Sequence, residues 1–233
     1  MTTTTSTAIT ATTTATTATA PNTLWFAPGA SSRVSLIALE ECGVPYGMVP
    51  VAVLAGEARQ PEYLALNPKG KVPLLRTPQG WLTENIAIVT YLDAMHPQAG
   101  LLPAHNPWVQ AQAMSLIAWC ASTLHPMIYR LRMTARVCDI EASQPRVKEL
   151  ALGELAAQLN VAEARLAASD SPWLMSAAWC MADTYLYWVW SRAIICGIEP
   201  TQFPRIAGLV ELVLARPATQ RAIAREAAAA PAV

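Results

Sequence analysis

Two adjacent serines, Ser31 and Ser32, stand just before a run of residues whose apolar spacing predicts a helix over 34–43. A hydroxyl at the start of a helix either caps the free N–H groups or donates a hydrogen bond to a ligand held there. No partner base accompanies the serines in sequence, so neither is expected to act as a nucleophile. The predicted chemistry is hydrogen bonding to a developing negative charge, with simple helix capping as the alternative.

A histidine, His125, lies within the helical segment AWCASTLHPMIYRLR, residues 118–132. Pro126 is expected to kink this helix, because proline removes one backbone hydrogen bond and crowds the preceding turn. Such a kink opens a wall beside the histidine. A lone histidine on an apolar helix is also commonly a core or interface group, and the sequence leaves both interpretations open.

The elements that must position these side chains follow a β-α-β, β-β-α order in the first part of the chain. Strands are predicted over 24–27, 46–51, 72–76 and 81–83, and helices over 34–43, 61–66 and 85–95. The first helix is expected to end at Gly43, since glycine accepts the left-handed conformation that closes a helix.

The second part of the chain is predicted to be entirely helical. Helical patterns cover 107–135, 145–169, 180–197, 203–215 and 217–228, with prolines near helix starts or in loops. The fold class is therefore an α/β domain of residues 23–96, a proline-rich linker of residues 97–106, and an all-α domain of residues 107–228. Residues 1–22, almost entirely Thr and Ala, are predicted to be a disordered low-complexity tail.

Composition narrows the functional classes. The 233 residues contain 16 basic and 16 acidic side chains, so no basic field favours nucleic acid. Hydrophobic residues make up 53% and charged residues 14%, which favours an oligomer, while the most apolar stretch is interrupted by polar residues and predicts no membrane span. The tail lacks the features of a signal peptide, and five cysteines without a C-x-x-C spacing indicate reduced thiols in a cytoplasmic protein.

The chain resembles the cytosolic glutathione S-transferase superfamily, in particular its bacterial beta-like members, over about residues 24–228. Five segments carry the resemblance: Phe26-Ala-Pro-Gly-Ala-Ser-Ser32, Asn67-Pro-Lys-Gly-Lys-Val-Pro73, Leu82-Thr-Glu-Asn85, Ser122-Thr-Leu-His125 and Ala182-Asp183. The resemblance implies a thioredoxin-like N-terminal domain that binds glutathione beside an all-helical C-terminal domain.

By this resemblance, the glutathione-binding residues are Lys71, Val72, Pro73, Glu84 and Asn85. A cis Val72-Pro73 bond would turn the Val72 backbone outward, where the cysteinyl unit of glutathione can pair with it as a short added strand. Glu84 would accept the γ-glutamyl ammonium, and Asn85, where many relatives have serine, would donate to the γ-glutamyl carboxylate. Each residue also has a purely structural alternative. Pro73 could simply begin an edge strand, Glu84 could be a favourable acid in the first helical turn, and Lys71 could only solvate its turn.

Ser31 stands at the position of the cysteine that characterises beta-class chemistry. The absence of this cysteine disfavours thiol-disulfide exchange through an enzyme thiolate. The resemblance implies instead that Ser31 or Ser32 donates a hydrogen bond to the glutathione sulfur, and that His125 faces the same site. The family's neighbouring asparagine and lysine are replaced here by Ala118 and Pro126.

The second-substrate pocket is expected to include Tyr129 and Arg132, which would suit an acidic or aromatic electrophile, with a solvated basic stripe as the alternative. Asp183 matches a buried structural aspartate of the family, and because Cys180 replaces its usual Ser or Thr partner we expect a degraded capping box.

The predicted function is therefore a homodimeric cytoplasmic glutathione transferase without metal or nucleic acid, acting on a hydrophobic electrophilic small molecule. A glutathione-dependent isomerase and a non-catalytic binding or assembly protein are the alternatives.

Overall fold

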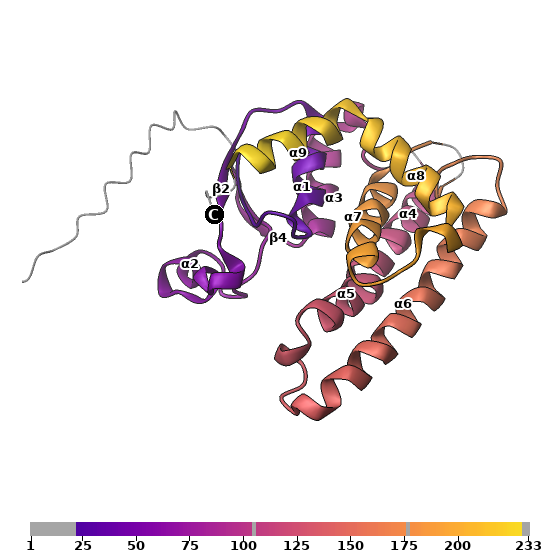
Figure 1. Cartoon of the computed structure of the whole chain (residues 1–233). Helices are drawn as coiled ribbons and strands as arrows, with labels where there is room; N and C mark the ends of the chain where they lie inside the picture. The colour runs from indigo at the N-terminus through magenta and orange to yellow at the C-terminus, as the bar shows by residue number, and fades with distance from the viewer. Residues whose placement is uncertain (1–21, 104–105, 176–177, 230–233) are drawn as a thin grey trace, which may run out of the picture.

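The computed structural model describes residues 22–103, 106–175 and 178–229, which form an N-terminal α/β domain and a helical C-terminal domain (Figure 1). The α/β domain contains β1 (Asn22–Phe26), α1 (Ser32–Cys42), β2 (Tyr46–Pro50), α2 (Pro61–Leu66), β3 (Leu74–Thr77), β4 (Gly80–Thr83) and α3 (Asn85–Met95). This order confirms the predicted fold class.

The four strands form one mixed sheet in the order β2-β1-β3-β4. β1 and β2 are parallel, whereas β3 is antiparallel to both β1 and β4. The long helices α1 and α3 pack together on the sheet, and α1 is buried along most of its length. Gly43 ends α1 with a φ of 65°, as its sequence position predicted.

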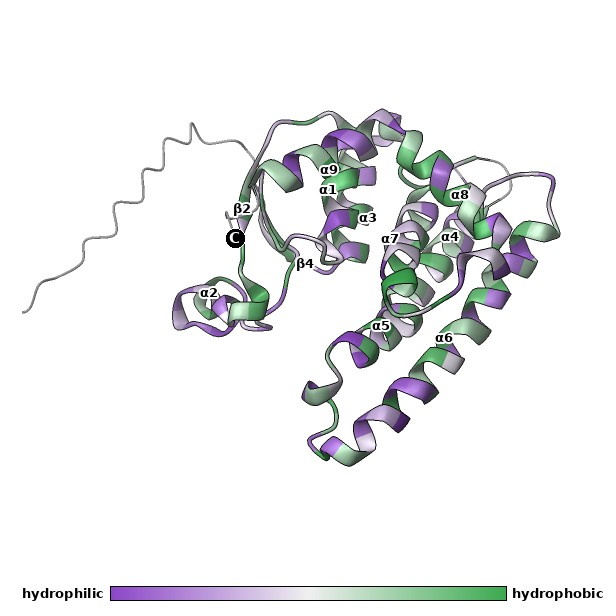
Figure 2. Cartoon of the chain, in the orientation of Figure 1, coloured by the Kyte–Doolittle hydropathy of each residue, from purple (hydrophilic) through white to green (hydrophobic). Residues whose placement is uncertain are grey.

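The helical domain contains α4 (Pro107–Trp119), α5 (His125–Arg132), α6 (Gln144–Ala167), α7 (Met181–Ile195), α8 (Pro204–Ala215) and α9 (Pro217–Ala229). The central helix α7 is buried from Met181 to Trp190. Figure 2 shows hydrophilic and hydrophobic turns alternating along α6, which covers one side of the domain. Among the residues that the structure describes, no helix is both long enough and apolar enough to cross a membrane.

The predicted continuous helix over 107–135 is divided in the structure. A π-helical turn, Cys120–Leu124, separates α4 from α5 and lies immediately before His125 and Pro126. The wider turn is one way in which a helix adjusts where proline crowds the preceding backbone. The interruption places His125 at the start of α5.

The last helix, α9, returns to the first domain and lies beside α1 (Figure 1). Arg221 and Arg225 both donate to the carboxylate of Glu40, each at 2.8 Å, and Arg216 donates to Glu41 at 2.7 Å. Glu40 also accepts a 2.7 Å hydrogen bond from the Tyr46 hydroxyl. These three arginines therefore attach the C-terminal part of the chain to the far end of α1.

The structure differs from the sequence-based prediction at two places. Asn22 was assigned to the tail, but it begins β1 and pairs with Tyr46; the remaining tail residues lie outside the described part of the chain. The capping box of α7 was expected to be degraded, yet Asp183 accepts the Cys180 N–H at 2.8 Å and the Cys180 thiol faces the Asp183 N–H. Sulfur is large and polarisable, so it reaches this N–H from the cap position.

Candidate active site

A cavity of about 630 Å³ lies where the α/β domain meets the start of α5. Its walls come from five places in the sequence: the start of α1, the loop before β3, the junction of β4 with α3, the π-turn with α5, and Tyr185 of α7. The lining residues with polar side chains are Ser31, Asn67, Lys69, Lys71, Thr83, Glu84, Asn85, Ser122, His125, Tyr129 and Tyr185.

The two serines at the start of α1 have different environments. Ser31 occupies the N-cap position but has helical backbone angles and makes no side-chain cap, and it lines the cavity. Ser32 is fully buried, and its Oγ accepts the Ala27 N–H at 3.2 Å and donates to the Ala27 carbonyl at 3.3 Å. Ser32 therefore closes the turn between β1 and α1, while the Ser31 hydroxyl is the one presented to the cavity.

The loop before β3 presents backbone groups to the cavity. The Val72-Pro73 bond is cis, as predicted, and Val72 and Pro73 both line the cavity. The Lys71 carbonyl is held by the Tyr63 hydroxyl and by the Asn67 amide, each at 2.7 Å. β3 begins only at Leu74, so Val72 lies beyond the last residue that pairs with β1.

The junction of β4 and α3 contains Glu84, the one non-glycine residue with positive φ, 71°, among those that the structure describes. Such a conformation costs about 1–3 kcal/mol and is found mainly where function or binding requires it. Lys69 pairs with Glu84 Oε1 at 2.7 Å and also donates to the Thr83 hydroxyl. Asn85 is buried, and its Oδ1 accepts a 2.7 Å hydrogen bond from Ser35 of α1, which fixes the amide beside the helix N-terminus.

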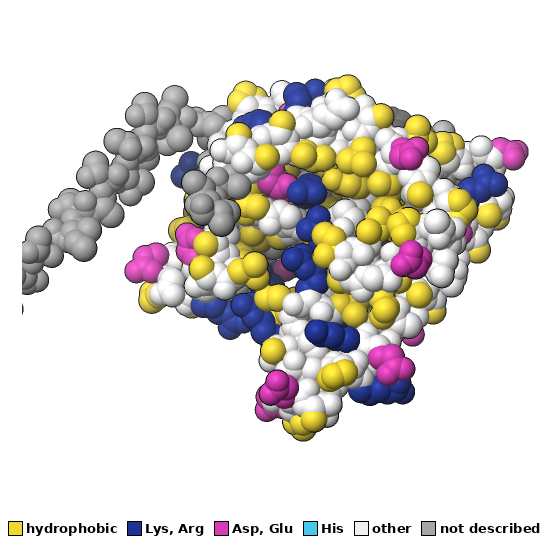
Figure 3. Space-filling model, viewed as in Figure 1, with side chains coloured by type: hydrophobic (Ala, Val, Ile, Leu, Met, Phe, Trp, Pro, Cys, Tyr) yellow, Lys and Arg dark blue, Asp and Glu magenta, His cyan; other side chains and the backbone are white. Residues whose placement is uncertain are grey.

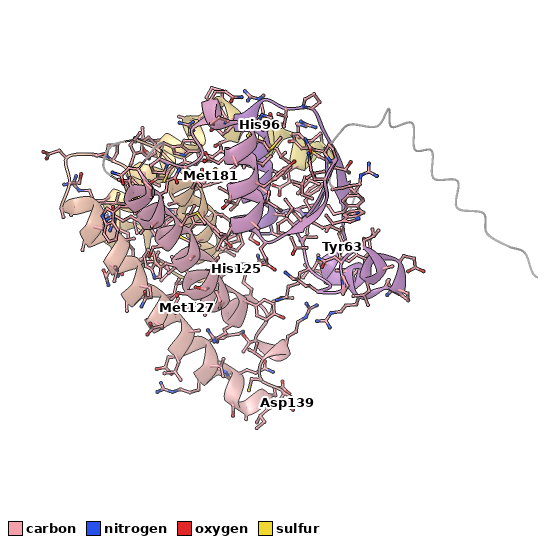
Figure 4. The ribbon with its side chains drawn as sticks, turned by 180° about the vertical axis from the view of Figure 1, so that it is seen from behind. Tyr63, His96, His125, Met127, Asp139 and Met181 are labelled. Atoms are coloured by element: carbon pink, nitrogen blue, oxygen red, sulfur yellow. The ribbon has the colours of Figure 1, made fainter. Side chains whose placement is uncertain are left out.

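His125 lines the cavity from the helical domain. In Figure 4 it lies near the middle of the molecule, and Tyr63 of α2 lies in the other domain. Its Nδ1 lies 3.5 Å from the Tyr185 hydroxyl, and its ring packs edge-on against Trp188 at 4.5 Å between centroids. Burial, reinforced by the positive charge of Lys71, lowers the pKa of His125 to about 4. Burial raises the pKa of Tyr185, although the nearby Asn85 and Ser31 side chains oppose this.

Most of the predicted site residues meet at this cavity. Eight line it: Ser31, Lys71, Val72, Pro73, Glu84, Asn85, His125 and Tyr129. Ser32 lies behind it, and Arg132 lines a separate hollow near Cys196. Sequence analysis missed Asn67, Lys69 and Thr83, although all three lie within or next to the segments it singled out. It also missed Tyr185, because nothing in the sequence of α7 indicates which of its buried aromatic residues faces the cavity.

The fold and this cavity define a two-domain protein with a thioredoxin-like domain and a cavity at the domain boundary. Residues 20–94 match the model of the glutathione S-transferase N-terminal domain family. The chain is 30% identical to maleylacetoacetate isomerase of Pseudomonas aeruginosa over 92% of that protein and 85% of this chain. It is likewise 30% identical to the glutathione S-transferase GstA of Escherichia coli O157:H7 over 98% of that protein and 87% of this chain. The chain belongs to the glutathione S-transferase family of enzymes.

Other similarities agree with this assignment. A maleylacetoacetate isomerase of Rhizobium meliloti is 39% identical over 56% of this chain, a match that spans 62% of that protein. The crystal structure of a glutathione transferase homolog from Sulfitobacter, with bound glutathione, superposes with a TM-score of 0.82 at 30% identity, covering 89% of this chain and 99% of the other. A beta class enzyme of Sphingomonas chungbukensis superposes with a TM-score of 0.76 at 26% identity over 88% of this chain and 98% of the other.

Proposed function

We propose that this protein is a beta-like glutathione transferase that binds glutathione in the cavity and activates its thiol through Ser31. The observation that carries the proposal is the placement of the Ser31 hydroxyl, which lines the cavity at the N-terminus of α1 without capping that helix. The Sulfitobacter homolog, which superposes over nearly its whole length, contains bound glutathione.

The residues around the cavity suit the three parts of this tripeptide. The Val72 backbone can pair with the cysteinyl unit. Glu84 Oε1 is occupied by Lys69, which leaves Oε2 for the γ-glutamyl ammonium. The N-terminus of α3, with the Asn85 amide, can hold the γ-glutamyl carboxylate, because free N–H groups and the helix dipole favour an anion there. Lys71 can reach the carboxylate at the other end of the peptide.

The thiol must lose its proton to react. Lowering a thiol pKa by about 2 units requires about 2.7 kcal/mol of preferential stabilisation of the thiolate. The dipole of α1 supplies about 0.3–1 kcal/mol, and one hydrogen bond to a charged acceptor about 1.5–3 kcal/mol. The two contributions together reach the required value, so a serine donor at this helix start is sufficient.

The proposed reaction is attack of the bound thiolate on an electrophilic carbon of a hydrophobic small molecule. A carbon–sulfur bond forms as the bond to the leaving group breaks, which gives conjugation, dehalogenation or ether cleavage. We further propose a cytoplasmic homodimer, as the apolar composition favours an oligomer and the cysteines indicate reduced thiols.

The identity to maleylacetoacetate isomerases favours a second candidate function. In an isomerase the thiolate would add to a double bond, allow rotation and leave again, so that glutathione is returned. Product analysis separates the two reactions, because only the transferase consumes glutathione.

The test pairs calorimetric measurement of glutathione binding with turnover of 1-chloro-2,4-dinitrobenzene. Binding with turnover and net loss of glutathione is the expected result. Binding without turnover of this halide or of a cis-alkene diacid would support the non-catalytic alternative, for which the loss of the cysteine and of the family residues at Ala118 and Pro126 argues. Absence of binding would overturn the proposal.

A further inference from the structure

Arg192 of α7 lies against the loop that leads into the proposed active site. Its Nη1 is 3.1 Å from the position that a Cβ on Gly29 would occupy. One turn earlier on α7, Trp188 donates to the Gly29 carbonyl at 3.2 Å. Gly29 is only two residues before Ser31, so their Cα atoms are at most about 7.6 Å apart.

Arg192 differs from the arginines that join the two domains. Arg33 pairs with Glu226. The arginines at the end of α8 and on α9 pair with Glu41 and Glu40, but none of the described residues places a carboxylate within ion-pair distance of Arg192. Its Nε donates only to the hydroxyl of Ser191, at 3.2 Å. The nearest acid of this cluster, Glu226, is already engaged by Arg33 and by the Gly29 N–H.

The electrostatic environment of Arg192 opposes its own charge. Burial and the positive charges of Arg33 and Arg132 lower its pKa, and Tyr187 and Glu226 offset only part of this effect, although a guanidinium remains charged at neutral pH. A half-buried cation without a counter-ion raises the free energy of the folded chain. Such an arrangement is commonly found where a ligand supplies the missing charge.

Arg132 extends the positive region along α5. It lies one turn beyond Tyr129, which lines the glutathione cavity, and it lines a neighbouring hollow of about 390 Å³. The other charged residues of this hollow are Lys148 and Glu149 of α6, so its lining has two cations and one acid. In Figure 3, Lys and Arg side chains (dark blue) follow one another down the hollow between the two halves of the molecule. Arg192 lines neither space, but it lies one turn before Ile195 and Cys196 of the hollow's wall and against the Gly29 loop. An acidic ligand that extends from the hollow toward this loop would therefore meet Arg132 of α5 and Arg192 of α7.

We propose that the electrophilic second substrate carries a carboxylate, which Arg192 binds with help from Arg132 while the electrophilic carbon faces the thiolate at Ser31. This inference rests on the proposed transferase function and deepens it by naming a substrate class. The short separation between Gly29 and Ser31 suits a compact substrate in which one aromatic ring or a short chain joins the two groups.

The experiment compares two probes that differ only in charge, 4-chloro-3-nitrobenzoate and its neutral methyl ester. In both, the glutathione thiolate forms a bond to the chlorine-bearing ring carbon and chloride leaves with the bonding electron pair, while the thiol proton passes to solvent. The measured quantity is the ratio of kcat/KM for the acid to kcat/KM for the ester, each divided by the uncatalysed rate constant with free glutathione.

Arg192→Gln is expected to lower this ratio about tenfold or more, chiefly through the KM for the acid, because it removes a charged hydrogen-bond donor. Arg192→Lys should keep part of the preference, and Arg132→Gln should lower it less. Arg205→Gln, at an exposed position of α8 that lines neither the cavity nor the hollow, is the matched control and should leave the ratio unchanged.

The two proposals fail in distinguishable ways. If the wild type turns over both probes and Arg192→Gln leaves the ratio unchanged, the acidic-substrate inference is overturned while the transferase function stands. If the wild type neither binds glutathione nor turns over either probe, the proposed function itself fails. Should Arg192→Gln not fold, the wild type decides: the KM for the acid, but not for the ester, must rise with ionic strength.

Discussion

The carboxylate of Glu226, near the end of the last helix, accepts a hydrogen bond from the backbone N–H of Gly29 at 3.1 Å. The same carboxylate accepts from Arg33 Nε at 2.7 Å, and its side chain is only 3% exposed. Gly29 adopts a φ of 72°, a conformation that glycine takes without strain. With Trp188 on its carbonyl, this residue is held on both sides by the C-terminal domain, and Ser31 follows two residues later.

Glu226→Gln is therefore expected to disturb the thiol chemistry without touching glutathione. It weakens the hold on Gly29 and leaves Arg33 without its partner, a change that costs about 3 kcal/mol of folding stability for a buried pair. The pKa of the bound glutathione thiol should rise by about 0.5–1 unit, equivalent to about 0.7–1.4 kcal/mol of lost thiolate stabilisation. An ultraviolet titration of the complex measures this pKa, and denaturant unfolding measures the stability.

Arg225→Gln is the control, because it weakens the attachment of the same helix at Glu40, at the far end of α1. It should lower stability while leaving the thiol pKa at its wild-type value. A thiol pKa unchanged in Glu226→Gln as well would mean that the loop holds its conformation without the last helix.

The two serines are expected to separate cleanly by substitution. Ser31→Ala should raise the pKa of the bound thiol by about 1–2 units, the value of one charged hydrogen bond, with a smaller effect on glutathione affinity. Ser32→Ala should leave that pKa unchanged but lower the free energy of unfolding by about 1–3 kcal/mol, because it leaves the buried N–H of Ala27 without its partner, while the Ala27 carbonyl still accepts from the Ala30 N–H. Thiolate titration and denaturant unfolding of both variants and the double mutant check these outcomes. If the bound thiol has the wild-type pKa in Ser31→Ala, Ser31 does not activate it, and either His125 does so or the non-catalytic alternative is favoured.

The fold was predictable because its signals are local. Apolar spacing located the strands and helices, and prolines at positions such as Pro107, Pro204 and Pro217 marked helix starts, where proline loses nothing. The division of the helix at Cys120–Leu124 was not predictable in detail, since proline permits a kink, a break or a wider turn and only the packing around it selects one.

The site residues were predictable where one short segment of the sequence both contains the residue and fixes its backbone position. Val72, Glu84 and Asn85 belong to such segments, and all three line the cavity. The roles of Ser31 and Ser32 were not separable in sequence, because only the turn back to Ala27 decides which hydroxyl is occupied. Contacts between distant segments, such as Arg192 with the Gly29 loop, carry no local signal and required the structure.

A final pair of residues predicts how stability depends on pH. The folded pKa of His125 is lowered to about 4 from an ordinary 6.5. As the pH falls from about 6.5 to 4, the unfolded chain binds a proton at His125 before the folded one does, so this group removes stability. Its contribution is about 3 kcal/mol, at 1.36 kcal/mol for each unit of pKa shift.

Asp183 acts in the opposite direction over nearly the same range. Burial raises its folded pKa from 3.8 to about 6, although the N–H groups of Leu174 and Cys180 oppose this. Between about pH 6 and 4 the folded chain binds the proton first, so this group adds stability as the pH falls, again by about 3 kcal/mol. In the wild type the two contributions therefore nearly cancel.

Replacing either residue should reveal the pH dependence that the other contributes to stability. His125→Asn is expected to become steadily more stable relative to wild type as the pH falls from 6.5 to 4, by up to about 3 kcal/mol, because the loss caused by His125 is gone. Asp183→Asn should lose stability relative to wild type over the same range, in addition to a loss at every pH from placing an amide donor where a carboxylate accepts two N–H groups. Urea unfolding at half-unit pH intervals measures both differences, and taking them relative to wild type cancels the titration of the exposed groups. Parallel curves for wild type and His125→Asn across this range would show that His125 takes up its proton equally in the folded and unfolded chain, and that the wall of the cavity is wetter than its packing against Trp188 indicates.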